Sequence, residues 1–299
     1  MARDDGVGFI LIAKRFGLCA LLVASMLAGC TPGGGGAGAP PIDQDKLEAG
    51  IDRTLGGGET CVVVADAANG RTLYQYGNAG VCMRPLPPCS TFEIANTLIG
   101  LNLGLITPQT VFKWDGAPQP VKAWESDADL AKAFRYSIVW QQQRLAQQVG
   151  HDRYAQQLKA FDYGDRGPAG PINGFWLGPK AGGALAISTR QQVGFLRRLY
   201  AGQLPVKPEA AAFLRQIMID ETRADARGRR YVMSGKAGSC SSLADGSRSV
   251  GWWVGRLQTP DRDLLFAASV EAANAPPGAE VQQRIKDVFA DAGLWPGGA

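Results

Sequence analysis

Ser90 and Glu93 are the two residues of this chain best placed to do chemistry. They stand in Pro87-Pro88-Cys89-Ser90-Thr91-Phe92-Glu93, where the proline pair keeps the incoming backbone extended. Apolar residues at helical spacing follow from Ile94 to Leu105, which predicts a helix that starts at this serine. A hydroxyl at a helix start lies beside unpaired backbone N–H groups and the positive end of the helix dipole. This placement suits a nucleophile.

The same spacing also fits a structural role. In a capping box, Ser90 would accept a hydrogen bond from the N3 amide, and Glu93 would reach back to the N–H of the serine. Under that interpretation the chain is a structural protein of the cell envelope and the pair has no catalytic part. The two interpretations differ in whether Ser90 faces a pocket.

Histidine chemistry is nearly excluded by composition. The chain has a single histidine, His151, in Gly150-His151-Asp152 between two predicted helices, where we expect a surface junction. Because this one histidine is expected at the surface, we do not expect a Ser-His-Asp triad, and a single histidine cannot form a multi-histidine metal site. An activated serine therefore needs another base, and we expect no metal and no cofactor.

Four short motifs that could share one site occur in the chain, in a fixed order. They are Ser90-Thr91-Phe92-Glu93, then Ser137-Ile138-Val139, then Phe161-Asp162-Tyr163-Gly164-Asp165 with Phe175-Trp176-Leu177, and last Lys236-Ala237-Gly238 with Gly251-Trp252-Trp253-Val254-Gly255. Taken together, over nearly all of residues 59 to 292, they resemble the active-site motifs of the class D serine β-lactamases, the oxacillinases. That family has Lys where this chain has Glu93.

The resemblance implies a role for each motif. Ser90 would be the nucleophile, Ser137 the hydroxyl of a proton relay, and Lys236 the proton shuttle or carboxylate anchor. The N–H groups of Ser90 and Ser239 would form the oxyanion hole. The residues implied to contact the substrate are Val139, Trp176, Ala237 and Gly238. The implied ligand is a β-lactam or a small molecule that resembles a peptidoglycan peptide.

The residues that differ from the family pattern are those expected to act as the base or to bind the substrate. The first-motif lysine of class D enzymes carries CO2 as a carbamate that serves as general base, whereas Glu93 is a shorter carboxylate with an ordinary pKa near ~4.3. Ala237 replaces a hydroxyl residue, and Asp165 replaces Asn in a place expected to lie beside Glu93. Arg284 is a weak candidate for the arginine that holds the substrate carboxylate. We therefore expect slow hydrolysis, with a non-hydrolysing β-lactam sensor as the alternative.

Element patterns predict a sheet interrupted by helices. Strands are expected at residues 61–67 and 72–76 around an Asn69-Gly70 turn, and again at 230–234, 250–257 and 264–270. Helices are expected after a Ser126 cap, at 138–149, at 152–161, after a Ser188 cap, from Pro208, and at 279–292. This order favours an α+β protein, an antiparallel sheet flanked by helices plus a helical subdomain. The resemblance implies the serine β-lactamase or penicillin-binding transpeptidase-like fold.

The beginning of the chain has the features of a lipoprotein signal peptide. A basic segment precedes an apolar run too short to span a bilayer, and Leu27-Ala28-Gly29-Cys30 resembles a bacterial lipobox. We expect a signal peptide at 1–29, lipid on Cys30, a Gly/Pro-rich tether at 30–45 and one domain at 46–299. This predicts a periplasmic protein anchored by lipid, with Thr31 favouring the outer membrane of a Gram-negative bacterium; an ordinary secretory signal is the alternative.

The net charge and the cysteines lead to predictions about partners and disulfides. A net charge of +4, without a basic patch, gives no support for nucleic-acid binding, and the sequence indicates no oligomeric state.

After the signal and Cys30, four cysteines remain, which allow three pairings. Cys61 and Cys82 flank the first hairpin and should pair. Under the resemblance, Cys89 and Cys240 adjoin the two oxyanion-hole residues and should also pair, as in some class A carbapenem-hydrolysing enzymes, with two free buried thiols as the alternative.

Overall fold

The computed structural model describes residues 40–165 and 167–297. The predicted signal at 1–29, Cys30 and most of the tether lie outside these residues. Within the predicted tether, Asp43 caps helix α1 (Gln44–Leu55) by accepting a hydrogen bond from the Lys46 N–H, and Ile42 packs against the core. The folded part therefore begins a few residues before the predicted boundary at 46.

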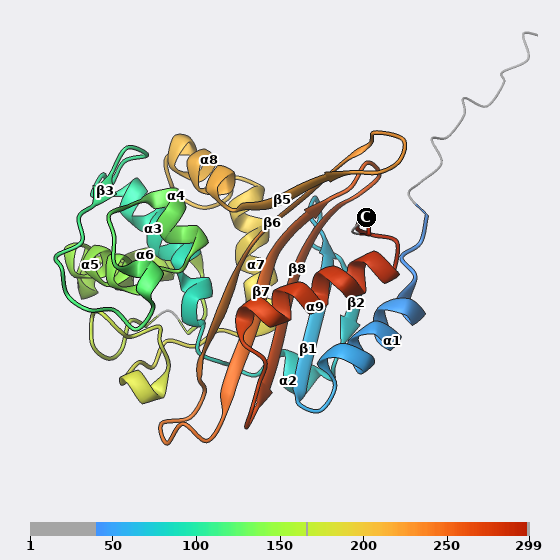
Figure 1. Ribbon diagram of the computed structural model, residues 1–299, viewed down its shortest axis with the longest axis horizontal. Coiled ribbons are helices and arrows are strands. Elements are labelled where there is room, and N and C mark those ends of the chain that lie inside the picture. Colours follow the sequence, from blue (N-terminus) through green and yellow to red (C-terminus); the bar gives the residue numbers. More distant parts are fainter. Residues whose placement is uncertain (1–39, 166, 298–299) are drawn as a thin grey trace, which may run out of the picture. The chain divides into compact units, whose positions relative to one another are not determined.

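A six-stranded antiparallel sheet is the centre of the fold (Figure 1). Its order across the sheet is β2-β1-β8-β7-β6-β5. The strands are β1 (Glu59–Asp66), β2 (Thr72–Tyr76), β5 (Ile219–Ala224), β6 (Arg230–Ser241), β7 (Ser249–Gln258) and β8 (Asp263–Ala272). The first two strands thus lie beside the last, and the helical middle of the chain is inserted between β2 and β5. This is the predicted α+β arrangement, an antiparallel sheet flanked by helices with a helical subdomain.

Two strand predictions needed correction. β6 is seven residues longer than the predicted segment 230–234, because residues 235–241 continue to pair with β7. β5 was not predicted, since Ile-Asp-Glu-Thr-Arg-Ala lacks an apolar alternation. Charged residues are common on edge strands, where they oppose pairing with another chain, and β5 is the edge of this sheet.

Each face of the sheet packs a different set of helices. Along β1, Val62 and Val64 belong to the core beneath α1 and α9 (Gly278–Asp291), whereas Cys61 and Val63 belong to the core on the other face. This alternation follows from the two-residue period of a strand. Figure 1 shows α9 and α1 on one side of the sheet. The opposite core holds α7 (Thr189–Tyr200) and the helical subdomain.

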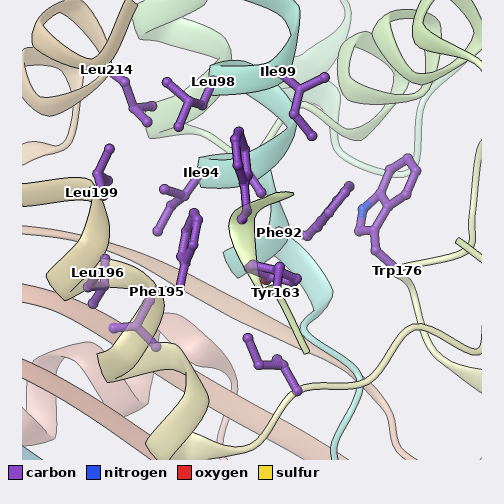
Figure 2. Close-up of a cluster of buried hydrophobic side chains, with 14 of the residues drawn as sticks. Phe92, Ile94, Leu98, Ile99, Tyr163, Trp176, Phe195, Leu196, Leu199 and Leu214 are labelled. Atoms are coloured by element: carbon purple, nitrogen blue, oxygen red, sulfur yellow. The ribbon is translucent and has the colours of Figure 1, made fainter. Parts of the chain in front are cut away.

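The helical subdomain forms around α3 (Glu93–Asn102). Its other helices are α4 (Leu130–Arg135), α5 (Val139–Val149), α6 (His151–Phe161) and α8 (Pro208–Ile217). Shorter elements are α2 (Ala79–Cys82), β3 (Val111–Phe112), β4 (Ala128–Asp129) and the 3-10 turns η1 (Cys89–Phe92), η2 (Lys122–Trp124) and η3 (Pro179–Ala181). Figure 2 shows the apolar side chains of α3 meeting those of α7 and α8. This core supports the start of α3.

Helix boundaries followed the predictions in most places. Ser188 caps α7 with a capping box completed by Gln191, and Pro208 opens α8. His151 is the exposed first residue of α6, directly after Gly150, which has φ +78 and separates α5 from α6. The Ser126 prediction was wrong: Asp129 caps α4 instead, by accepting from the Lys132 N–H at 2.8 Å.

Candidate functional site

Ser90 lies in a tight turn just before α3, and it does not cap that helix. The cap position of α3 is Phe92, which makes no side-chain capping bond, and Ser90 sits in the preceding 3-10 turn η1. The capping-box interpretation of Ser90 and Glu93 was therefore wrong. Cys89 enters the turn with φ +52, a conformation uncommon for residues other than glycine. Such a backbone is kept only where the surroundings enforce it.

Several contacts hold this turn. The Thr91 hydroxyl donates to the Pro88 carbonyl at 2.6 Å and accepts from the Gln192 amide at 2.8 Å. The Cys89 N–H donates to the Trp176 carbonyl at 3.0 Å. Together they leave Ser90 half-buried, at the wall of a pocket.

The pocket has a volume of about 440 Å³ and collects most of the predicted site residues. Seven of them line it: Ser90, Ser137, Val139, Lys236, Ala237, Gly238 and Ser239. These residues come from η1, the start of α5 and strand β6. Residues far apart in the chain therefore converge on one cavity, as the motif order implied.

Lys236 connects the polar groups of this pocket. Its ammonium donates to the Ser137 hydroxyl and, at 3.0 Å, to the Ala237 carbonyl. Its Nζ lies 3.5 Å from Oε2 of Glu93 and 5.6 Å from the centre of the Phe134 ring. Lys236 is only 4% exposed, so these groups replace the water that an ammonium would otherwise bind. Ser137 itself has φ +49, a second uncommon backbone conformation at the site.

Glu93 is a buried carboxyl behind the pocket wall. It is 1% exposed, is absent from the pocket lining, and its Oε2 has no hydrogen-bond partner among the residues that the structure describes. Burial raises the pKa of Glu93 to about 7, because an ionised carboxylate is poorly stabilised away from water. The charge of Lys236 and the hydroxyls of Ser90 and Ser137 oppose this rise. A carboxyl with a pKa near neutrality can take up and release a proton there.

The backbone of β6 presents two N–H groups to the pocket. The Gly235 N–H donates to the Met218 carbonyl at 2.8 Å, just where β5 begins. Because N–H directions repeat every two residues along a strand, the N–H groups of Ala237 and Ser239 point to the same edge. Beyond Ser234, none of the described strands pairs with this edge. The Ser239 N–H thus faces the side on which η1 lies.

Gly238 allows β6 to approach the Ser90 turn closely. A Cβ at residue 238 would lie 2.9 Å from the Ser90 nitrogen and 2.8 Å from the Thr91 nitrogen. Only a residue without a side chain permits this separation. The amides of Ser90 and Ser239 are therefore neighbours, the arrangement that an oxyanion hole requires.

Both predicted disulfides are present. Cys61 and Cys82 have their Cα atoms 5.2 Å apart, and Cys89 and Cys240 have theirs 5.7 Å apart. The second bond ties the residue before Ser90 to the residue after Ser239. It therefore links η1 and β6 covalently, at the point where their two amides meet.

Three other predicted positions lie away from the pocket. Trp176 does not line it: the indole is 1% exposed and packs on Phe92 and Phe175, with ring centres 5.5 and 5.1 Å apart. Asp165 is exposed near Gly167, and it is not among the groups that shift the pKa of the buried Glu93, so the expectation that it lies beside Glu93 was wrong. Partial burial of its carboxyl raises the pKa of Asp165.

Arg284 is also remote from the pocket. It donates to the Thr54 carbonyl and pairs with Glu280, which places it between α9 and α1. In contrast, several pocket residues were not predicted, among them Trp124, Arg135, Tyr136, Leu177, Asp220 and Gln282. Arg135 and Tyr136 directly precede Ser137, so the sequence offered that one local signal for them.

No helix in residues 40–165 and 167–297 combines the length and apolarity needed to cross a membrane.

Comparisons with known proteins agree on one group. The family model of the penicillin-binding protein transpeptidase domain matches residues 60–290. Beta-lactamase OXA-48 of Klebsiella pneumoniae is 35% identical over 185 residues, which are 62% of this chain and 65% of that protein. Beta-lactamase OXA-20 of Pseudomonas aeruginosa is 31% identical over 216 residues, 72% of this chain and 75% of that protein. The chain thus spans about two thirds to three quarters of these relatives.

Solved structures show the same likeness. The class D beta-lactamase FUS-1 (OXA-85) of Fusobacterium nucleatum subsp. polymorphum superposes with a TM-score of 0.73 at 26% identity, covering 84% of this chain and 98% of that one. The class D beta-lactamase YbXI from Nostoc gives a TM-score of 0.72 at 30% identity, covering 83% and 98%.

Proposed function

This chain belongs to the class D β-lactamase family of penicillin-binding protein transpeptidase domains, and from that membership we propose that it opens β-lactam rings and carries the acyl group on Ser90. One observation carries the proposal. Ser90, the Ser137 hydroxyl that accepts a hydrogen bond from Lys236, and two backbone amides meet at one pocket, and a buried carboxyl lies behind them. A nucleophile, a proton source and an oxyanion site are the parts that acyl transfer needs.

The geometry supports a closed proton path for ring opening. Oγ of Ser90 attacks the lactam carbonyl carbon while Glu93, in its ionised form, takes the hydroxyl proton. The Oγ–C bond forms, and the carbonyl oxygen is held by the amides of Ser90 and Ser239. As the C–N bond breaks, Lys236 passes a proton through the Ser137 hydroxyl to the leaving nitrogen. The proton on Glu93 then returns to Lys236, whose Nζ lies 3.5 Å from Oε2.

Glu93 is poorly placed to act as the general base in the second step, the hydrolysis of the acyl-enzyme. In this proposal Glu93 stands where the family carries a lysine, and its carboxyl is buried outside the pocket lining. A base must come within ~2.6–3.2 Å of the proton it takes, or act through one water. Glu93 is one turn from Ser90 but has no direct access to water in the pocket. The acyl-enzyme should therefore be long-lived, with slow turnover.

The same burial supports a second candidate function, a β-lactam sensor that is acylated once and does not hydrolyse. Purified protein incubated with benzylpenicillin, followed by intact mass and ring opening together, separates the two. Several ring openings per molecule indicate a hydrolase, and one persistent adduct indicates the sensor. Ser90→Ala is expected to abolish the adduct completely. An unchanged adduct in Ser90→Ala, or no adduct in the unmodified protein, would contradict acylation at Ser90.

The pH dependence of acylation should report Glu93. Because the base must be ionised and its pKa is about 7, the acylation rate constant should rise about tenfold per pH unit below 7 and level off above it. Glu93→Gln should lower the plateau by roughly 10²–10⁴-fold and remove the midpoint near 7. Stopped-flow acylation with a chromogenic cephalosporin between pH 5 and 9 measures both effects.

An exposed carboxylate provides the control for that experiment. Glu48 on α1 is exposed, and Glu48→Gln changes the net charge by the same amount at a distance from the pocket. This variant should keep both the rate and the midpoint. A midpoint near 7 that persists in Glu93→Gln would assign the titration to another group.

We also propose that lipid on Cys30 holds the protein at the periplasmic side of the outer membrane. The support is the Leu27-Ala28-Gly29-Cys30 motif after a basic and apolar segment. Cys30→Ala should move the protein from the membrane fraction to the soluble periplasmic fraction. Retention of this variant in the membrane fraction would contradict a lipid anchor at residue 30.

A further inference from the structure

The catalytic pocket is lined by three charged side chains, Arg135, Asp220 and Lys236. Two of them already have partners. Lys236 is bound to Ser137 and the Ala237 carbonyl and lies beside Glu93. Asp220 forms an ion pair with Lys286 at 2.5 Å. Both side chains are therefore already held by partners within the protein.

Arg135 differs from both. It is exposed, and within residues 40–165 and 167–297 its guanidinium forms no ion pair with a carboxylate of the chain. A wall residue that keeps its charge available is suited to a ligand of opposite charge. Arginine presents paired N–H donors that match the two oxygens of a carboxylate.

The part of the pocket formed by the start of α9 offers no side-chain charge. It contributes Pro277, Gly278, Ala279 and Gln282, none of which is ionised. Arg284, the predicted anchor, faces α1 and not the pocket. Ala237 supplies no hydroxyl. A carboxylate bound in this pocket therefore has its strongest available partner on the α4 side.

The backbone fixes where Arg135 stands. It ends α4 two residues before Ser137, and the intervening turn is closed by the Tyr136 N–H donating to the Lys132 carbonyl at 3.0 Å and the Ile138 N–H donating to the Ala133 carbonyl at 3.0 Å. The guanidinium is thus attached by a short, hydrogen-bonded segment to the hydroxyl that serves the leaving nitrogen. In a bicyclic β-lactam, the carboxylate is carried on the carbon bonded to that nitrogen.

We propose that Arg135 binds the carboxylate of the β-lactam and so makes the site selective for anionic ligands. This rests on the proposed function, which supplies the ligand class. Arg135 is a specificity-determining residue, and acylation at Ser90 does not depend on it chemically.

Benzylpenicillin and its methyl ester, which differ only in the carboxylate charge, test the assignment. Acylation rates are measured by intact mass for the unmodified protein and for Arg135→Gln. Dissociation constants are measured by calorimetry for Ser90→Ala and for the double variant that combines Ser90→Ala with Arg135→Gln. Hydrogen bonds to charged groups are worth roughly tenfold to hundredfold in affinity. We expect Arg135→Gln to lower both the acylation rate with benzylpenicillin and the affinity for it by this factor. With the methyl ester, both quantities should change by no more than about twofold.

Arg227→Gln is the matched control, because Arg227 is an exposed arginine of the β5–β6 hairpin and its loss changes the net charge equally. It should leave both ligands unchanged. The proposal is overturned if Arg135→Gln changes the rate and affinity equally for the acid and the ester, or if Arg227→Gln has the same effect as Arg135→Gln. Either result would favour the first-turn amides of α9 as the anion site. A different result separates this inference from the proposed function. If the unmodified protein forms no adduct, but the affinity of Ser90→Ala for benzylpenicillin still depends on Arg135, acylation is rejected and this inference is kept.

Discussion

Glu93→Lys is expected to raise the turnover of benzylpenicillin by at least roughly 10²-fold in the presence of bicarbonate, the lower end of what a positioned general base contributes. The residue is 1% exposed, and burial favours the neutral form of an amine. A neutral amine can add CO2 and become a carbamate, the base that the resemblance to class D enzymes implies. The longer side chain would also extend toward water in the pocket, which the Glu93 carboxyl does not reach.

Ring opening followed at saturating substrate, in buffer with bicarbonate and in buffer depleted of CO2, measures this effect. The gain should appear only with bicarbonate. Glu93→Met is the control, since it has a similar length and no amine, and it should stay slow in both buffers. A variant Glu93→Lys that remains as slow as the unmodified protein would show that position 93 is not the site of the base for acyl release.

Gly238→Ala should lower the acylation rate by roughly 10²–10³-fold, the loss typical of a damaged oxyanion hole. The added Cβ would lie 2.8 Å from the Thr91 nitrogen, 2.9 Å from the Ser90 nitrogen and 3.3 Å from the Pro88 carbonyl oxygen. These are backbone atoms in a turn tied by a disulfide at Cys89, so they have little freedom to move away. The strand or the turn must shift, and the two amides then no longer converge.

Gly194→Ala serves as its counterpart. Gly194 lies within α7, and a Cβ there would meet only the end of the Arg198 side chain, at 3.5 Å. Alanine is favoured over glycine inside a helix by about 1 kcal/mol, so this variant should melt slightly higher and acylate normally. Intact-mass acylation rates and thermal melting on the two variants separate a local effect on the site from a general effect of adding a methyl group. Normal acylation in Gly238→Ala would contradict the assigned oxyanion hole.

Most elements of the fold could be predicted from local patterns. The strands β1, β7 and β8 are mostly apolar runs that are buried along most of their length, and β2 follows the Asn69-Gly70 turn. The cap at Ser188 and the start at Pro208 follow local backbone chemistry. β5 was missed because its polar sequence reflects its position at the sheet edge. The cap of α4 was misplaced because Ser126 and Asp129 are both acceptable caps, and the packing of α4 selects between them.

The site divides in the same way. The sequence by itself determined which residues stand in the four motifs and their order, because Ser90, Ser137 and Lys236 each stand in a motif of neighbouring residues. It also determined that Glu93 is a carboxylate. Only the tertiary structure decided that Ser90 faces a pocket instead of capping α3, that Glu93 has a pKa near 7, and that Arg284 lies away while Arg135 lines the wall. These properties depend on burial and on the distance between side chains from different elements, and neither quantity is set by neighbours along the chain.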